Sequence, residues 1–346
     1  MSQKLVISPS GNFYGSEQVL LDYLQNTQMV LDVAVPEKSL FLDKLEEAKT
    51  IHRIRPYNNK KLPAFYAKVF WQLLTGKYKL VYLNEAGHIK YLTLLARIFS
   101  KKKFIVHVRM LEDASASRWK QGISENITVL AISKYISDLL PVKNLLLYDA
   151  YTFSDNRKNN TEDPLILRIA IIGRITKTKG LGLLPVLIDR IQKDGLEGKY
   201  IFELYGEIAD DISKDELLAE LQKSKFIELK GFEKNKEAIY QSVDCILHLS
   251  RQEALGRIFF EALDHYKPLV GFRAAGIGEI AEMLQLNHWL ADPASPDPAS
   301  EIYRILKDVR LNYKSRVCET EQKKNLAIQL FNPAIYQSRI DNLLSA

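Results

Sequence analysis

The stretch Ser250-Arg251-Gln252-Glu253-Ala254-Leu255-Gly256-Arg257-Ile258-Phe259-Phe260-Glu261-Ala262-Leu263 follows an apolar run from Val243 to Leu249. The run predicts a buried parallel strand. The stretch after it predicts a loop that turns at Gly256 into a helix. Glu253 then lies in the loop and Glu261 about two turns into the helix. Because ligands of doubly wound α/β sheets bind beyond the strand ends, the two carboxylates are placed to face two parts of one long ligand.

A second strand-to-helix turn stands upstream of this stretch. The apolar run 165–172 predicts a strand, and Gly173-Arg174-Ile175-Thr176-Lys177-Thr178-Lys179-Gly180 follows it. Arginine can offer a phosphate two parallel hydrogen bonds, and lysine supplies a compact charge. Two cations in such a turn suit a diphosphate, although two solvated surface cations are the alternative interpretation.

Further strand endings carry glycine or other small residues. The strand expected at 200–205 leads into Gly206, and the one at 226–229 leads to Gly231-Phe232. The loop 274–279 has the sequence Ala-Ala-Gly-Ile-Gly-Glu and runs into a helix. We expect all of these loops at the same edge of one sheet, because parallel strands share their carboxyl edge.

The first half of the chain repeats the strand, loop and helix order. A strand at 4–8 is followed by the loop Pro9 to Gly15 and by Ser16, a plausible N-cap residue. Three further candidates follow later strands: His88 lies after the strand at 80–84, and His107 and Arg109 end the strand at 101–109. A lone histidine in a strand is more often a core or surface residue than a ligand contact, and that alternative stays open.

The composition suits two α/β domains. The chain has 346 residues, 47% of them hydrophobic, which is enough for two cores. We expect a first domain at 1–150, a linker at 151–164, a second domain at 165–332, and a last helix at 333–346 that packs back on the first domain. The two cysteines form no metal-ligand pattern. No signal peptide or membrane span is predicted. We therefore expect a cytoplasmic protein that can associate with the inner face of the membrane.

The positive charge is concentrated in the first half. Residues 1–150 hold 21 Lys and Arg against 13 Asp and Glu, whereas the rest holds 27 against 29. Lysines alternate with aromatic residues over 57–79, a pattern that can make a membrane-surface patch. The alternative is that the aromatic residues pack inward and the lysines form a solvated face. Nucleic acid is not the expected partner, because no nucleic-acid-binding motif accompanies the charge.

Taken together, these motifs resemble those of the retaining glycosyltransferases of the GT-B fold, particularly family 4. Glu253 and Glu261 match its Glu-x7-Glu signature, and 173–180 matches its Gly-Arg-x4-Lys-Gly turn. The resemblance implies an α/β fold of two Rossmann-like domains facing across a cleft. It also implies sugar transfer from a nucleotide-diphosphate donor, of the UDP or GDP type, without a metal or cofactor. A glycan or lipid-linked acceptor, as in bacterial surface polysaccharide synthesis, fits the family's habits.

The resemblance also assigns roles to single residues. Arg174 and Lys179 would stabilise charge on the leaving diphosphate, Glu253 would bind the donor sugar together with His107, and Glu261 would bind the ribose. The other residues that it implies in donor binding are Gly15, Gly231, Phe232, Ala254, Leu255 and Gly256. It leaves His88 and Arg109 as candidates for the acceptor.

Three positions depart from the family pattern. Ala254 and Ala275 stand where glycine is usual, and the glycine that commonly precedes Pro268 is missing. None of these changes removes a charged group that the chemistry needs. Two alternatives remain, namely a sugar-nucleotide epimerase of the same fold and a catalytically silent partner subunit.

Overall fold

The structure is a computed structural model that describes residues 3–120, 122–154 and 162–345. It divides into two compact units: Met1–Thr152 with Phe331–Ala346, and Phe153–Leu330. The linker expected at 151–164 includes residues 155–161, which lie outside the described residues.

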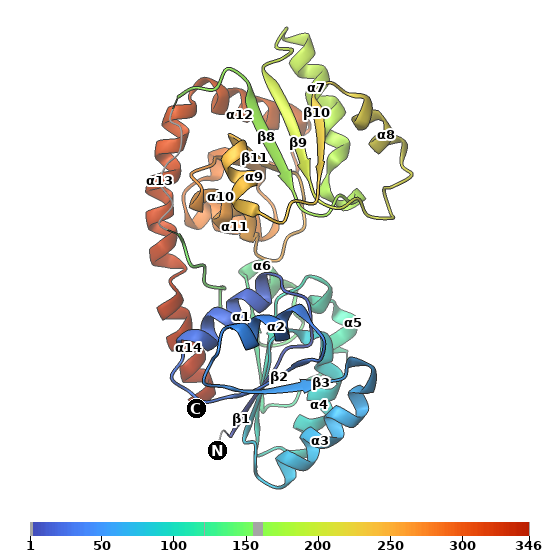
Figure 1. The fold of residues 1–346 in the computed structure, drawn as a ribbon, viewed down its shortest axis with the longest axis vertical. Helices are drawn as coiled ribbons and strands as arrows, with labels where there is room; N and C mark the ends of the chain where they lie inside the picture. The colour runs from blue at the N-terminus through green and yellow to red at the C-terminus, as the bar shows by residue number, and fades with distance from the viewer. Residues whose placement is uncertain (1–2, 121, 155–161, 346) are drawn as a thin grey trace. The chain divides into compact units, whose positions relative to one another are not determined.

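The described part of the first unit forms a seven-stranded parallel sheet in the order β3-β2-β1-β4-β5-β6-β7 (Figure 1). Its strands are β1 (Lys4–Ile7), β2 (Asp32–Pro36), β3 (Arg53–Tyr57), β4 (Leu80–Leu83), β5 (Lys103–Val108), β6 (Ile127–Ala131) and β7 (Leu145–Leu146). Its helices are α1 (Gly15–Asn26), α2 (Leu40–Glu47), α3 (Leu62–Leu74), α4 (Ile89–Ile98), α5 (Ala116–Trp119), α6 (Lys134–Leu139) and α14 (Pro333–Ser345).

The last helix belongs to the first unit. Figure 1 shows α14 beside α1, and Tyr336, Ile340 and Leu344 enter the core of that unit. The Tyr23 hydroxyl on α1 donates to the Asp341 carboxylate at 2.7 Å, which fixes the two helices against each other.

The described part of the second unit forms a six-stranded parallel sheet in the order β10-β9-β8-β11-β12-β13. Its strands are β8 (Leu167–Ile172), β9 (Tyr200–Tyr205), β10 (Ile227–Gly231), β11 (Cys245–His248), β12 (Leu269–Phe272) and β13 (Leu290–Ala291). Its helices are α7 (Leu184–Lys193), α8 (Glu216–Lys223), α9 (Lys236–Ser242), α10 (Arg257–Asp264), α11 (Ala275–Met283), α12 (Pro298–Leu311) and α13 (Tyr313–Leu330).

Both sheets have the same doubly wound topology. The chain starts in the middle of each sheet, and the strand order reverses between β1 and β4 and again between β8 and β11. These switch points open a crevice at the carboxyl edge of the sheet, which is the usual place for a ligand in this architecture. The loops that follow β8 and β11 therefore occupy the expected binding edge of the second unit.

Strand β11, which leads into the loop carrying Glu253, is buried along its whole length, and this burial explains its continuous apolar sequence. It is shorter than the apolar run 243–249 that predicted it. Helix α13 was not predicted, because it is mostly polar and buries only a few of its residues. It packs on α10, the helix that carries Glu261.

Of the helices in the described ranges, none is both long and apolar enough to cross a membrane.

Candidate functional site

The loop that leads into α10 turns at a position only glycine fills comfortably. Gly256 has φ +87°, and a Cβ placed there would lie 2.4 Å from the Ile277 side chain of α11. The turn thus brings the start of α10 and the start of α11 into close contact. This agrees with the role predicted for Gly256 from the sequence.

The start of α11 packs on the same loop. The Gly276 amide donates to the Glu253 carbonyl at 2.9 Å, and a Cβ on Gly276 would lie 2.6 Å from the Cα of Leu255. Ala275 has the left-handed φ of +49°. That conformation costs a non-glycine residue about 1 kcal/mol or more, so the loop carries local backbone strain at this position.

The turn after β8 lies against the end of β11. Gly180 has φ +74°, and a Cβ there would lie 2.4 Å from the Leu249 carbonyl oxygen. A Cβ on Gly206, at the end of β9, would lie 2.1 Å from the Gly173 carbonyl oxygen, whereas a Cβ on Gly173, with φ +125°, would come within 3.8 Å of the Lys179 side chain. The Arg174 side chain is exposed next to this turn. Gly180 of the predicted diphosphate turn and Gly206 after β9 therefore allow close packing of three strand ends.

This packing brings two of the predicted residues together. The Lys179 ammonium lies 3.9 Å from the Glu253 carboxylate, and both side chains are partly exposed. Burial raises the pKa of Glu253, and the Lys179 charge works against that rise. The pair places one cation and one hydrogen-bond acceptor side by side at the carboxyl edge of the sheet.

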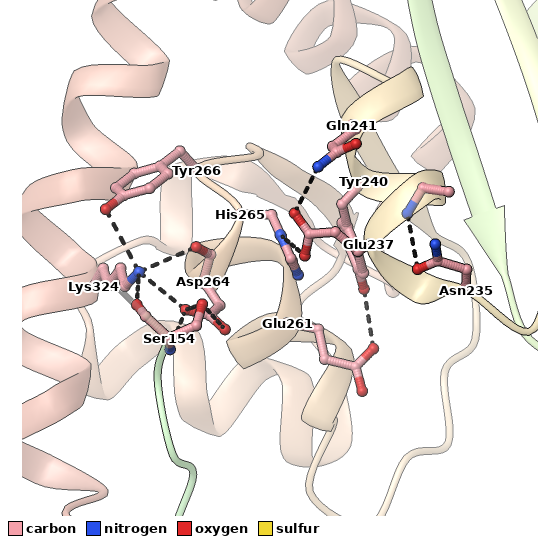
Figure 2. A network of polar contacts seen from close by, with 11 residues as sticks. Ser154, Asn235, Glu237, Tyr240, Gln241, Glu261, Asp264, His265, Tyr266 and Lys324 are labelled. Carbon is pink, nitrogen blue, oxygen red and sulfur yellow. Dashed lines mark hydrogen bonds and ion pairs between the residues drawn. The ribbon is translucent and has the colours of Figure 1, made fainter. Parts of the chain in front are cut away.

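Glu261 is held by two residues that the sequence analysis did not single out. The Lys236 ammonium lies 2.7 Å from Glu261 Oε1. The Tyr240 hydroxyl donates to Oε2 at 3.0 Å, as Figure 2 shows. Both partners come from α9, the helix that precedes β11. The helical spacing of Lys236 and Tyr240 put them on one face, but no sequence pattern connected that face to Glu261.

His248 is a second residue that the sequence analysis missed. It ends β11, is buried, and its Nε2 has no hydrogen-bond partner among the described residues. Burial lowers its pKa to about 3, and the Lys179 charge contributes. A neutral imidazole therefore lies beside the lysine of the predicted diphosphate turn.

The remaining donor candidates lie on the same edge. Gly231 ends β10 with φ +70°, and the Phe232 side chain after it is 69% exposed. Ala254 and Leu255 form the loop before Gly256, and Leu255 is buried against α11. Phe232 is thus available for contact, whereas Leu255 shapes the loop from within.

In the first unit, Gly15 opens α1 next to an acidic cluster. The Ser16 hydroxyl lies 2.5 Å from Glu85 Oε1 and 3.1 Å from Glu17 Oε2. Burial, and after it the Glu17 charge, raises the pKa of Glu85 to about 7. Negative charge at this helix start disfavours a phosphate group, so the structure gives the loop at Gly15 a different electrostatic character from the one the resemblance implies.

The two candidate histidines are packed inside the first unit. His107 is fully buried, with Nδ1 3.2 Å from the Tyr82 hydroxyl, and burial keeps its pKa well below the ordinary value. His88 lies with Nδ1 3.1 Å from the Tyr66 hydroxyl, and burial lowers its pKa to about 4. Both rings are neutral at pH 7 and largely shielded from solvent within their own unit.

Arg109 requires a correction. Its guanidinium is buried, pairs with the Asp149 carboxylate, and donates to the Tyr336 hydroxyl at 2.8 Å and the Asn84 carbonyl. These partners already bind the guanidinium N–H groups that an acceptor substrate would have to contact. Arg109 joins the end of β5 to α14 and therefore has a structural role.

The segment 57–79 has features of both interpretations, the inward-packed aromatic residues and the exposed membrane-surface patch. Tyr66, Val69 and Leu73 of α3 are buried, whereas Trp71 is 63% and Leu74 56% exposed. Tyr57 stacks on Phe65 with ring centroids 4.2 Å apart. Most of the aromatic residues therefore pack inward, and one tryptophan with one leucine remains on the surface.

Comparison with known proteins gives these sites a family context. Residues 152–323 match the family model described as glycosyl transferases group 1. A curated relative, the UDP-N-acetylglucosamine–peptide N-acetylglucosaminyltransferase GtfA subunit of Streptococcus parasanguinis, is 38% identical over 123 residues. That alignment covers 35% of this chain and only 24% of the relative.

Solved structures resemble the chain over nearly its whole length. The structure of Anabaena Alr3699/HepE with UDP and glucose has a TM-score of 0.78 at 16% identity and covers 99% of both chains. Sucrose-phosphate synthase of Thermosynechococcus elongatus has a TM-score of 0.71 at 12% identity, over 99% of this chain and 98% of that one. At such identities the likeness shows the fold alone, and the predicted two-domain GT-B fold is confirmed.

Proposed function

We propose that this GT-B chain, whose residues 152–323 match the glycosyl transferases group 1 family, transfers a sugar from a nucleotide-diphosphate donor to an acceptor. The observation that carries the proposal is the meeting of Lys179 and Glu253 at the carboxyl edge of the second sheet, 3.9 Å apart. The family's two motifs, distant in the sequence, supply one residue each to this pair.

The charges of the second unit suit departure of a diphosphate. Arg174 and Lys179 project from the turn after β8, where negative charge grows as the sugar-to-phosphate bond breaks. Cations fixed before the reaction stabilise that charge without reorganising in the transition state. We assign leaving-group stabilisation to these two side chains, without a metal ion, and we assign a retained anomeric configuration to the product.

The carboxylates suit the two hydroxyl-bearing parts of the donor. Glu253, in the loop before Gly256, would accept hydrogen bonds from hydroxyls of the transferred hexose, and Glu261 from the ribose. The Alr3699/HepE structures contain UDP with glucose or UDP-glucose, which supports a uridine donor for this chain, with a guanosine donor as the second candidate. The resemblance implies donor roles for His107 and Gly15 of the first unit as well, but His107 is fully buried and the acidic cluster beside Gly15 disfavours a phosphate group, so the proposal does not rest on either residue.

We assign a glycan or lipid-linked acceptor to the first unit, in synthesis of a bacterial surface polysaccharide. The basic charge of residues 1–150 and the exposed Trp71 and Leu74 support work at an anionic membrane face. His88 remains a candidate near the acceptor through its place after β4. Arg109 no longer does, because its guanidinium is occupied.

The experiment that tests transfer is release of nucleoside diphosphate from UDP-glucose, UDP-N-acetylglucosamine and GDP-mannose, in buffer containing EDTA. We expect slow release of UDP or GDP from one donor, and a much slower but measurable release in Lys179→Met. An epimerase would instead convert the sugar with the nucleotide still attached, which NMR of the products distinguishes. A silent subunit would bind no donor and release no nucleotide, and that result would reject transfer by this chain.

A further inference from the structure

We infer that Tyr240 and Lys236 orient the Glu261 carboxylate for the ribose contact that the resemblance implies, so that the preference of the second unit for ribonucleotide over deoxyribonucleotide donors depends on these two positioning residues. The inference rests on the proposed function and adds two positioning residues to it. No motif of the sequence pointed to either residue.

Within the described part of the chain, each oxygen of Glu261 has one partner. Oε1 lies 2.7 Å from the Lys236 ammonium, and Oε2 accepts from the Tyr240 hydroxyl at 3.0 Å. The side chain of Glu261 is 16% exposed, so it remains reachable from solvent. Because each carboxylate oxygen has two lone-pair sites, the group can accept one more hydrogen bond on each oxygen. Two neighbouring hydroxyls match that remaining capacity.

One short helix delivers both partners. Lys236 and Tyr240 are four residues apart on α9 and so lie on the same face. Asn235 caps the helix, since its Oδ1 accepts from the Ala238 amide at 3.4 Å. The position of α9 therefore sets the direction of the Glu261 carboxylate from both sides.

Packing locks the Tyr240 ring. Tyr240 is almost fully buried, and its ring stacks on His265 with centroids 4.3 Å apart and planes 8° from parallel. His265 Nδ1 lies 3.4 Å from Glu237 Oε2, and Gln241 donates to the other Glu237 oxygen at 3.0 Å. Figure 2 shows this sequence of contacts from Gln241 through Tyr240 to Glu261. The hydroxyl therefore has little freedom to follow a displaced carboxylate.

The Glu261 carboxylate can distinguish ribose from deoxyribose by the number of hydroxyl donors. An ionised carboxylate only accepts hydrogen bonds, and each ribose hydroxyl can donate one. A 2′-deoxy or 3′-deoxy nucleotide lacks one donor and leaves one oxygen of the site without its partner. Sites built to bind a substrate hydroxyl reject analogues that lack it far more strongly than apolar pockets reject a missing methylene.

The test is calorimetric binding of UDP, 2′-deoxy-UDP and 3′-deoxy-UDP, and of the corresponding guanosine series, to the wild type and to Tyr240→Phe. Loss of a hydrogen bond to a charged group should make each deoxy nucleotide bind at least about tenfold more weakly to the wild type. Tyr240→Phe should weaken the ribonucleotide about tenfold and the deoxynucleotides much less, so the preference shrinks. Lys236→Met should act in the same direction.

Tyr303→Phe is the matched control. The Tyr303 hydroxyl also donates to a carboxylate of the same unit, that of Asp194 at 2.7 Å, but Asp194 precedes β9 and so lies at the opposite edge of the sheet. This variant should keep the full preference. If Tyr240→Phe also keeps it while UDP or GDP binds the wild type, the inference is overturned and the proposed function stands. If neither nucleotide series binds the wild type, the proposed function itself fails.

Discussion

The Lys179 ammonium lies 3.9 Å from the Glu253 carboxylate, where the turn after β8 meets the loop after β11. The contact depends on Gly180, whose missing side chain lets the turn approach the Leu249 carbonyl. The geometry couples the titration of Glu253 to the cation beside it.

Lys179→Met should therefore shift the pH dependence of donor turnover. Burial already raises the Glu253 pKa, and Lys179 lowers it. Without the cation the pKa rises further, so the ionised form needed to accept sugar hydrogen bonds appears only at higher pH. The acidic limb of kcat/KM should move upward in pH, along with an overall loss of rate. Lys177→Met, which removes an exposed lysine paired with Asp215, should leave the limb in place; an unmoved limb in Lys179→Met would disprove the coupling.

Glu85 gives a prediction for stability. Its pKa is about 7 in the folded protein against 4.5 for an ordinary glutamate. The folded state then binds more protons, so the free energy of unfolding falls as pH rises from about 5 to 8, by roughly 2–3 kcal/mol. Glu85→Gln removes that loss and should gain on the wild type by the same amount between pH 5 and pH 8, measured by urea unfolding. Glu125→Gln, at an exposed position of the same unit, should show no such gain. A constant difference between Glu85→Gln and the wild type across this range would contradict the assignment.

Arg109→Leu should destabilise the first unit strongly. The substitution leaves the Asp149 carboxylate buried without its cation, which typically costs about 3–5 kcal/mol. Lys134→Ala breaks an exposed pair with Asp138 in the same unit and should cost less than about 1 kcal/mol. Urea unfolding followed by circular dichroism compares the two. Near-equal stabilities with lost acceptor binding would restore Arg109 as a ligand residue.

The exposed part of α3 predicts binding to anionic membranes. Trp71→Ala with Leu74→Ala should reduce co-sedimentation with phosphatidylglycerol vesicles, because it removes the apolar contact beside the lysines. Leu40→Ala removes an equally exposed leucine from α2 and should have no effect. Equal co-sedimentation of the double variant and the wild type, or no preference for phosphatidylglycerol over phosphatidylcholine, would reject this surface.

The fold was predictable because its strands are apolar runs with glycine at their ends. Buried parallel strands such as β11 have apolar side chains on both faces, so they appear in the sequence as continuous apolar runs. Helix α13 escaped prediction because it contacts α10 with few buried residues and shows no apolar stripe. A helix of that kind owes its position to partners elsewhere in the chain.

The site was predictable only where residue types and spacing carry the chemistry. The sequence predicted which edge of the sheet carries Glu253, Glu261 and Lys179. Each of them is close in the sequence to a glycine in a loop that follows a predicted strand. Tyr240 could not be connected to Glu261, because that pairing depends on how α9 packs beside α10. Arg109 resembled an accessible cation after a strand, and only the folded chain shows Asp149 in contact with it.

The most direct test of the account is a thermal-shift comparison of wild type, Lys179→Ala and Glu261→Ala with UDP-glucose, UDP-N-acetylglucosamine and GDP-mannose. A ligand that binds only the folded state raises the unfolding temperature. We predict that one uridine or guanosine donor raises it in the wild type and that each variant loses most of the rise. The same rise in both variants would show that the donor binds elsewhere, and no rise in the wild type with any donor would contradict the proposed function.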